Sequence, residues 1–272
     1  MTRKILVLMV VAMFAVVGCK KKDDDKKGKK KPTKNKVVKK DPVKKDPVKK
    51  KDPVSKPAPK PEVVLVVIHK VKDFGKWMKA FHAHQPKRVE AGVVGHFVTR
   101  GAKNENTVAV FLPGMSKEKL EAMTKSPELK DAMKKATVEG KPQFQWLTPV
   151  DNKMSKTKKK LAGMLVTHKV ADFDKWKKAY DAFDATRKKH KILGHAVARG
   201  VKDPNTVYVY HQAEEVETLK AFTKLKELGA AMKAAGVTGK PSFMYLKGEH
   251  SANYPPKGDM KKGDHKDHKG HK

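Results

Sequence analysis

Two stretches of the chain repeat one another at a constant spacing of 99 residues, and this duplication limits the possible folds more than any other feature. The segment 67–77 (VIHKVKDFGKW) corresponds to 166–176 (VTHKVADFDKW), and the match continues without a gap to Phe144 and Phe243, with about half of the positions identical. A period of this length is a whole domain, too long for one unit of a solenoid. The sequence therefore predicts two homologous domains, over 61–150 and 161–248, joined by a linker over 151–160.

Each copy has the pattern strand, helix, strand, strand, helix, strand. In the first copy the β-branched run 63–71 predicts a strand, and Asp73 stands where the N-cap of an amphipathic helix belongs. A second helix is expected after Ser116, and Pro127 should kink or split it. Further strands are expected over 93–99, 107–112 and 143–147. The order βαββαβ is that of the ferredoxin-like unit, so the predicted fold class is α+β.

A four-stranded sheet with helices on one face leaves its other apolar face uncovered, and the second copy can cover it. Both copies begin with His-x-Val-x-Asp-Phe-x-x-Trp, and the second also has the turn Asp-Pro-Asn-Thr-Val over 203–207 and the ending 235–241. With these motifs the chain resembles the dimeric α+β barrel superfamily, and within it the antibiotic biosynthesis monooxygenase-like domains. The resemblance implies that the two repeats form an intramolecular dimeric α+β barrel around a central cavity. It implies no single reaction, because the superfamily includes oxygenases, isomerases, haem-degrading enzymes and members without known activity.

The first 18 residues have the pattern of a secretion signal. Arg3 and Lys4 precede an apolar run over 5–17, which is shorter than the about 20 residues that span a bilayer. The following Gly18-Cys19 resembles the lipobox of bacterial lipoproteins, which implies cleavage before Cys19 and attachment of lipid to it. We therefore expect a cell-envelope protein anchored in the lipid bilayer, and Lys20 favours the outer membrane. The alternative is an incidental thiol at the end of an ordinary membrane anchor; as the only cysteine, it can form no disulfide within the chain.

Two low-complexity segments flank the repeats, a Lys/Pro-rich tether over 19–60 and a His/Lys-rich tail over 249–272. Neither has hydrophobic periodicity, so both are predicted to be disordered. Of the net charge of +34, only +6 falls in 61–150 and +7 in 161–247. Specific nucleic-acid binding is therefore not expected, since it needs a basic surface on folded elements.

The tether and the tail each allow a plain and a more specific interpretation. The tether is a solubilising spacer or adheres to an anionic lipid or envelope polymer through its lysines. The tail has three histidines at a spacing of three, but a flexible tract without supporting hydrogen bonds is a poor metal site, so none is predicted. These histidines are His265, His268 and His271.

Candidate pocket residues follow from alternation in the second and third strands of each copy. In 93–99 and its counterpart, histidine and arginine share one face, and small residues such as Ala196 and Ala198 occupy the other. Because small residues suit packing against helices, we expect the histidines and arginines to face the cavity between the sheets. The predicted lining for a small apolar ligand is His96, Arg100, Phe111, His195, Arg199, Tyr208 and Tyr210.

The alternative is that these histidines and arginines are structural groups that form hydrogen bonds at the ends of strands. The same structural interpretation is favoured more strongly for His69 and His168, near the end of the first strand of each copy. Trp77 and Trp176, at amphipathic helix spacing, are expected in the core.

The sequence has no nucleophile elbow, glycine-rich phosphate loop, HExxH or paired-cysteine motif. It therefore assigns no catalytic residue, cofactor or metal. The first hypothesis is a membrane-anchored binding or interaction module, monomeric with an internal pseudo-dimer, for a small apolar ligand. The second is a cofactorless oxygenase-like or isomerase-like enzyme with a histidine such as His195 as its base. A third is haem binding with histidine as the axial ligand.

Overall fold

The computed structural model describes residues 60–157 and 159–254. The expected signal peptide, the tether up to residue 59 and the tail from residue 255 lie outside these residues. The first repeat consists of β1 (Val63–Val71), α1 (Phe74–Ala83), α2 (Gln85–Glu90), β2 (Gly95–Gly101), β3 (Thr107–Gly114), α3 (Lys117–Lys125), α4 (Pro127–Lys135) and β4 (Val138–Lys153). The second consists of β5 (Ala162–Val170), α5 (Phe173–Ala182), α6 (Asp184–Lys189), β6 (Gly194–Gly200), β7 (Thr206–Ala213), α7 (Val216–Thr223), α8 (Lys226–Ala234) and β8 (Val237–Asn253).

The expected βαββαβ order is present in both repeats, with each helical segment divided in two. Asp73 caps α1 by accepting a hydrogen bond of 2.9 Å from the backbone N–H of Lys76. Ser116 caps α3 in the same way, through the backbone N–H of Lys119. Pro127 does split the second helical segment, because Ser126 ends α3 and caps α4.

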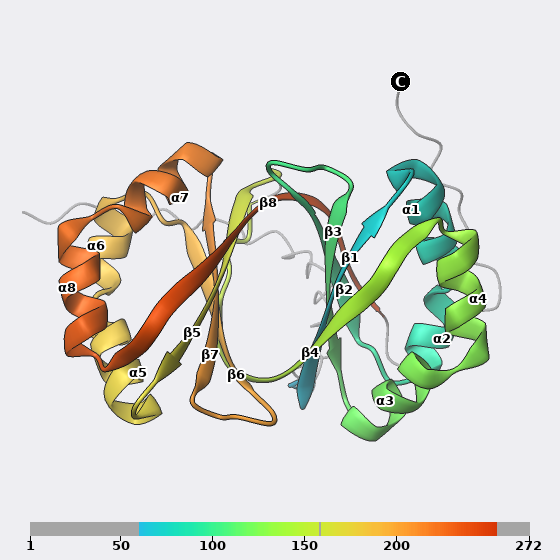
Figure 1. Ribbon diagram of the computed structural model, residues 1–272, viewed down its shortest axis with the longest axis horizontal. Helices are drawn as coiled ribbons and strands as arrows, with labels where there is room; N and C mark the ends of the chain where they lie inside the picture. Colours follow the sequence, from blue (N-terminus) through green and yellow to red (C-terminus); the bar gives the residue numbers. More distant parts are fainter. Residues whose placement is uncertain (1–59, 158, 255–272) are drawn as a thin grey trace, which may run out of the picture. The chain divides into compact units, whose positions relative to one another are not determined.

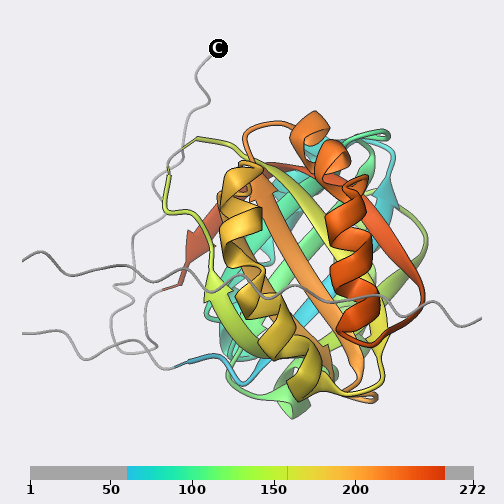
Figure 2. The same ribbon diagram turned by 90° about the vertical axis from the view of Figure 1, so that its left-hand side faces the viewer.

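The eight strands form one closed barrel in the order β1-β3-β2-β8-β5-β7-β6-β4. Each repeat contributes four neighbouring strands, and the barrel closes at two seams, β2 with β8 and β4 with β6. Figure 1 shows the two sheets facing each other with the helices on the outside, and Figure 2 shows helices of the second repeat lying across its strands. The α+β fold class and the internal barrel are thus confirmed.

The last strand of each repeat belongs to both sheets. The first part of β8 pairs with β5, and its second part, from Leu246 to Asn253, pairs with β2 of the other repeat. The strand β4 is shared between β1 and β6 in the same manner. These strands run past the expected domain ends at 150 and 248, so residues 249–253 are strand and not tail. The second repeat thereby pairs with the backbone groups at the otherwise open edge of β2.

Three hydrophobic clusters hold the barrel and its helices together. One lies between the first sheet and its helices around Trp77 and Leu120, and its counterpart in the second repeat surrounds Trp176 and Leu219. Both tryptophans are therefore in the core, as the sequence predicts. The third cluster contains inward-facing side chains from the strands of both repeats. Alternation along β1 thus directs one set of side chains to the helices and the other into the barrel.

Candidate functional site

The structure does not bring the seven predicted pocket residues into one site. Phe111, Tyr208 and Tyr210 point into the barrel as expected, but the histidines and arginines of β2 and β6 face the helices. The side chains that β2 and β6 direct inward include Phe97, Ala196 and Ala198. The prediction assigned the faces the wrong way round: the small residues Ala196 and Ala198 turn into the barrel, where larger rings from neighbouring strands fill the interior.

The barrel interior between the sheets is packed with aromatic rings. The ring centroids of Phe97, Phe111 and Tyr210 lie 5.3–5.8 Å apart. Tyr210 is buried, and a methyl group added at Gly163 would collide with its hydroxyl. These residues belong to the hydrophobic cluster that both repeats form inside the barrel.

His96 lies at the seam between β2 and β8. Its Nδ1 is 2.8 Å from the Tyr254 hydroxyl and its Nε2 is 2.7 Å from Nδ1 of His250, so both partners come from the second repeat. Burial lowers the pKa of His96 to about 3, and the nearby Arg88 charge acts in the same direction. At the other seam, Nε2 of His195 lies 3.7 Å from a carboxylate oxygen of Asp151. The hydrogen bonds of His96 fit the structural interpretation, whereas Nε2 of His195 has no hydrogen-bond partner among the described residues.

Arg100 and Arg199 hold matching turns. Arg100 Nε donates to the carbonyl oxygen of Glu105 at 2.6 Å, and its guanidinium lies 4.2 Å from the ring centre of Phe74. Arg199 Nε donates to the carbonyl oxygen of Pro204 at 2.6 Å. Since each arginine closes the turn after its own strand, their contacts also fit the structural interpretation.

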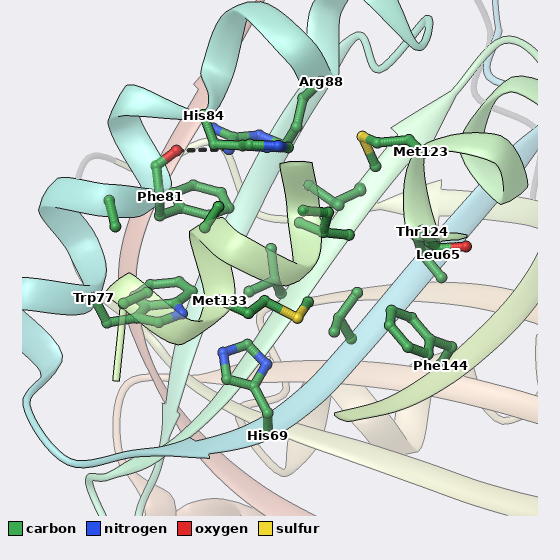
Figure 3. A pocket seen from close by; sticks show the side chains of 17 residues that line it. Leu65, His69, Trp77, Phe81, His84, Arg88, Met123, Thr124, Met133 and Phe144 are labelled. Atoms are coloured by element: carbon green, nitrogen blue, oxygen red, sulfur yellow. Dashed lines mark hydrogen bonds between the residues drawn. The ribbon is translucent and has the colours of Figure 1, made fainter. Parts of the chain in front are cut away.

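A pocket lies elsewhere, between the first sheet and its helices. It has a volume of about 70 Å³, and its lining comes from β1, β3, β4 and the helices α1 to α4. Figure 3 shows apolar side chains such as Met133 and Phe144 along its length, with His69 at one end and Arg88 at the other. Half-exposed Phe144 borders the pocket on the solvent side.

His69 supplies unsatisfied polar atoms to this apolar pocket. It is 7 % exposed, and neither ring nitrogen has a hydrogen-bond partner in the described part of the chain. Its ring centre lies 5.5 Å from that of Trp77. Burial lowers the pKa of His69 to about 4, so the imidazole is neutral at pH 7, with one N–H donor and one acceptor nitrogen. Each buried polar group left unsatisfied costs about 1–3 kcal/mol.

Arg88 borders the other end of the pocket. Its Nη1 donates to the carbonyl oxygen of Phe81 at 2.6 Å, its Nε donates to the Tyr254 hydroxyl at 3.0 Å, and its guanidinium lies 3.7 Å from the ring centre of Phe81. The side chain is 2 % exposed, and Nη2 has no hydrogen-bond partner among the residues that the structure describes. His84 Nε2, on the same side, is likewise unpartnered within these residues.

The second repeat places larger side chains at several corresponding positions. Phe222, Tyr180 and Phe183 replace Met123, Phe81 and His84, and a ring of similar volume, His211, replaces Leu112. The ring centres of Tyr180 and His211 are 6.2 Å apart, and those of His211 and Phe222 are 5.8 Å apart. His168 nevertheless keeps the position and the unpartnered nitrogens of His69. The buried histidine is thus common to both repeats, and the repeats differ in the size of the side chains near it.

The strand and helix patterns of the sequence do not indicate this pocket, although they place His69 near the end of the first strand. A comparison of the two copies position by position could have indicated it. The copies share one fold, so the few positions at which side-chain volume differs point to space in the first repeat. Within the described ranges, no group of three or more histidine, cysteine or acidic residues is placed to hold a metal ion. None of the helices in those ranges has the length and hydropathy needed to cross a membrane.

No known protein family and no curated protein matches the sequence. Among solved structures, an anthrone oxidase-like protein is similar with a TM-score of 0.53 and 14 % identity, over 72 % of this chain and 94 % of that one. A protein described provisionally as a monooxygenase, from Lactobacillus acidophilus NCFM, has a TM-score of 0.49 and 10 % identity over 71 % and 96 %.

An uncharacterized ferredoxin-fold protein from Listeria monocytogenes 4b F2365, related to antibiotic biosynthesis monooxygenases, has a TM-score of 0.43 and 4 % identity over 70 % and 96 %. At these identities the likeness shows the fold alone. The likeness to the anthrone oxidase-like protein, at a TM-score of 0.53, supports the α+β fold of this chain.

Proposed function

We propose that this chain is a binding module of the cell envelope, anchored through lipid on Cys19, whose first repeat binds a small and largely apolar ligand. The observation that carries the proposal is the pocket of about 70 Å³ between the first sheet and its helices. Apolar side chains line most of it, and its lining also includes His69 and Arg88, each of which has a buried nitrogen without a hydrogen-bond partner in the described residues. An apolar cavity with a few convergent polar groups is the usual form of a small-molecule site.

The size of the pocket limits the ligand. A cavity of about 150 Å³ holds benzene in another protein, and this one measures about 70 Å³. The ligand is therefore smaller than a drug-sized molecule, or it enters as the flexible side chains of Met123 and Met133 move aside. A haem group does not fit this space, so haem binding is not proposed.

An enzyme remains the second candidate, because the acceptor nitrogen of His69 borders the pocket and is suited to remove a proton from a bound molecule. With a pKa of about 4, however, the imidazole is a weak base at neutral pH. General-base catalysis is most efficient when the pKa of the base lies near the working pH. Binding is therefore favoured over oxygenase-like or isomerase-like chemistry. Turnover of a bound ligand that is lost in His69→Gln but retained in His195→Ala would reverse this preference.

The two repeats provide matched variants for a test of the pocket. We expect the mature chain to bind one equivalent of xenon or toluene, detected by shifts of backbone amide signals around Leu65 and Val110 in NMR spectra. Met123→Phe, which introduces the residue present at position 222, should abolish this binding. Phe222→Met should create a second site at the equivalent position. Binding to Met123→Phe with unchanged affinity and unchanged shifts would show that the ligand does not occupy this pocket.

A further inference from the structure

Arg88 is a buried cation whose contacts in the described chain include no carboxylate. Two of its three guanidinium nitrogens and the face of the group are used by the Phe81 carbonyl, the Tyr254 hydroxyl and the Phe81 ring. All of these partners are uncharged. Burial lowers the pKa of Arg88 and the Tyr254 hydroxyl raises it. A buried charge is normally paired, because removing it from water without a counter-ion is costly.

The second repeat contains the same arginine with a carboxylate partner. The guanidinium of Arg187 lies 3.9 Å from the ring centre of Tyr180, as Arg88 does over Phe81, but its Nη2 is 3.1 Å from a carboxylate oxygen of Asp184. The position that corresponds to Asp184 is Gln85, which is neutral. The repeat with the smaller side chains around the pocket is therefore also the repeat whose arginine lacks an acidic neighbour three residues earlier.

We infer that the ligand of this pocket is a small organic anion whose charged oxygen accepts a hydrogen bond from Nη2 of Arg88. This inference rests on the proposed function and adds the chemical class of the ligand. An anion would supply the charge that Asp184 supplies to Arg187, and a hydrogen bond between two charged groups is about twice as strong as one between neutral groups.

The remaining lining restricts the rest of the ligand. The side chains between Arg88 and His69 are apolar, among them Leu65, Val110 and Met133. Neutral His69 can donate to or accept from one further polar atom. Short-chain carboxylates, phenolates and enolates have this combination of an apolar body and one anionic oxygen.

The test compares anions with neutral molecules of the same shape. Butyrate and butyramide, and benzoate and benzamide, are titrated into the mature chain at physiological salt, with acetate as a control for general attraction to a cationic protein. We expect each carboxylate to bind at least about tenfold more tightly than its amide, which corresponds to about 1.4 kcal/mol.

Gln85→Asp provides the decisive variant, because it gives Arg88 the neighbour that Arg187 has and leaves the arginine and the pocket in place. Carboxylate affinity should fall by at least about tenfold while amide affinity stays unchanged. Gln85→Asn, without the charge, should behave as the natural chain. An NMR titration that finds the carboxyl pKa of the Gln85→Asp variant well below its ordinary value would show that the pair has formed; Arg88→Gln should reproduce the loss of carboxylate affinity.

Three outcomes would overturn the inference, and they have different consequences. Amides that bind as tightly as carboxylates, with both sensitive to Met123→Phe, would reject the anion and leave the proposed function standing. Carboxylate binding that neither Met123→Phe nor Gln85→Asp weakens would indicate non-specific attraction to the cationic chain. If no probe, xenon and toluene included, binds in a manner sensitive to Met123→Phe, the inference and the proposed function both fail.

Discussion

At the scale of single residues, four buried histidines are held in their neutral form. Burial lowers the pKa of His69 and His168 to about 4 and that of His96 and His211 to about 3. The ordinary value of about 6.5 applies in the unfolded chain. Between these values the unfolded chain binds more protons than the folded one, so the free energy of unfolding decreases as the pH falls from about 6.5 toward 4.

His168 allows this dependence to be measured away from the pocket. His168→Leu removes a titrating group that is 6 % exposed. Between pH 8 and pH 5 the natural chain should lose about 2 kcal/mol more free energy of unfolding than the variant. The reason is that His168 becomes protonated in the unfolded chain over this range while it stays neutral in the folded chain. Urea unfolding at a series of pH values gives both curves. Parallel curves would mean that His168 titrates alike in the folded and unfolded chains.

At the scale of elements, β4 and β8 connect the two halves, because each pairs first with its own repeat and then with the other. The end of β8 also carries His250 and Tyr254 to His96 and Arg88 of the first repeat. The pocket of the first repeat therefore depends on a residue that lies 166 positions away from Arg88 in the sequence.

Two truncated chains distinguish the contribution of the end of β8 to stability from that of the residues after Tyr254. A chain ending at Gly248 loses the part of β8 that pairs with Gly95 to Val98 of β2 and the buried Tyr254 ring, and we expect a loss of at least about 3 kcal/mol in the free energy of unfolding. Hydrogen exchange should show that the amides of β2 lose protection first. A chain ending at Tyr254 is the control and should unfold at the same urea concentration as the full chain. Equal stability of the two truncated chains would show that the seam contributes little.

At the scale of the whole molecule, duplication within one chain has allowed the two repeats to differ. A dimer of identical subunits would have two equal pockets, whereas here one repeat retains a cavity and the other carries larger rings at the matching positions. The arginine of the first repeat lacks the carboxylate that neutralises its counterpart. One half can then serve binding while the other contributes to the stability of the barrel.

The proposed anchor is tested on the full chain in its bacterial host. We expect the natural chain to sediment with membranes and to incorporate labelled palmitate, and Cys19→Ser to appear unlabelled in the soluble fraction, because Cys19 is the only cysteine. Retention of label in Cys19→Ser would contradict the lipid anchor. If Cys19→Ser stays with membranes at low salt and leaves them at high salt, the lysine-rich tether holds the chain electrostatically instead.

Much of the fold could be predicted from the sequence because its signals are local or repeated. The 99-residue spacing indicates two like domains, the N-cap Asp73 and the breaker Pro127 mark helix boundaries, and the uncovered sheet face requires a second copy. The extent of β8 could not be predicted, since residues 249–253 are polar and become strand only where the edge of β2 offers its backbone groups.

The candidate site was decided by the tertiary structure. Alternation showed that His96 and Arg100 share a face, but two faces are possible, and only the closure of the sheets into a barrel with the helices outside determines which one turns inward. The pocket depends on how side chains from seven elements leave space between them, which is a property of packing in three dimensions. The sequence by itself thus determined the duplicated α+β barrel, and the tertiary structure decided that the pocket lies under the helices of one repeat, where Arg88, without a carboxylate partner in the described residues, borders an apolar cavity.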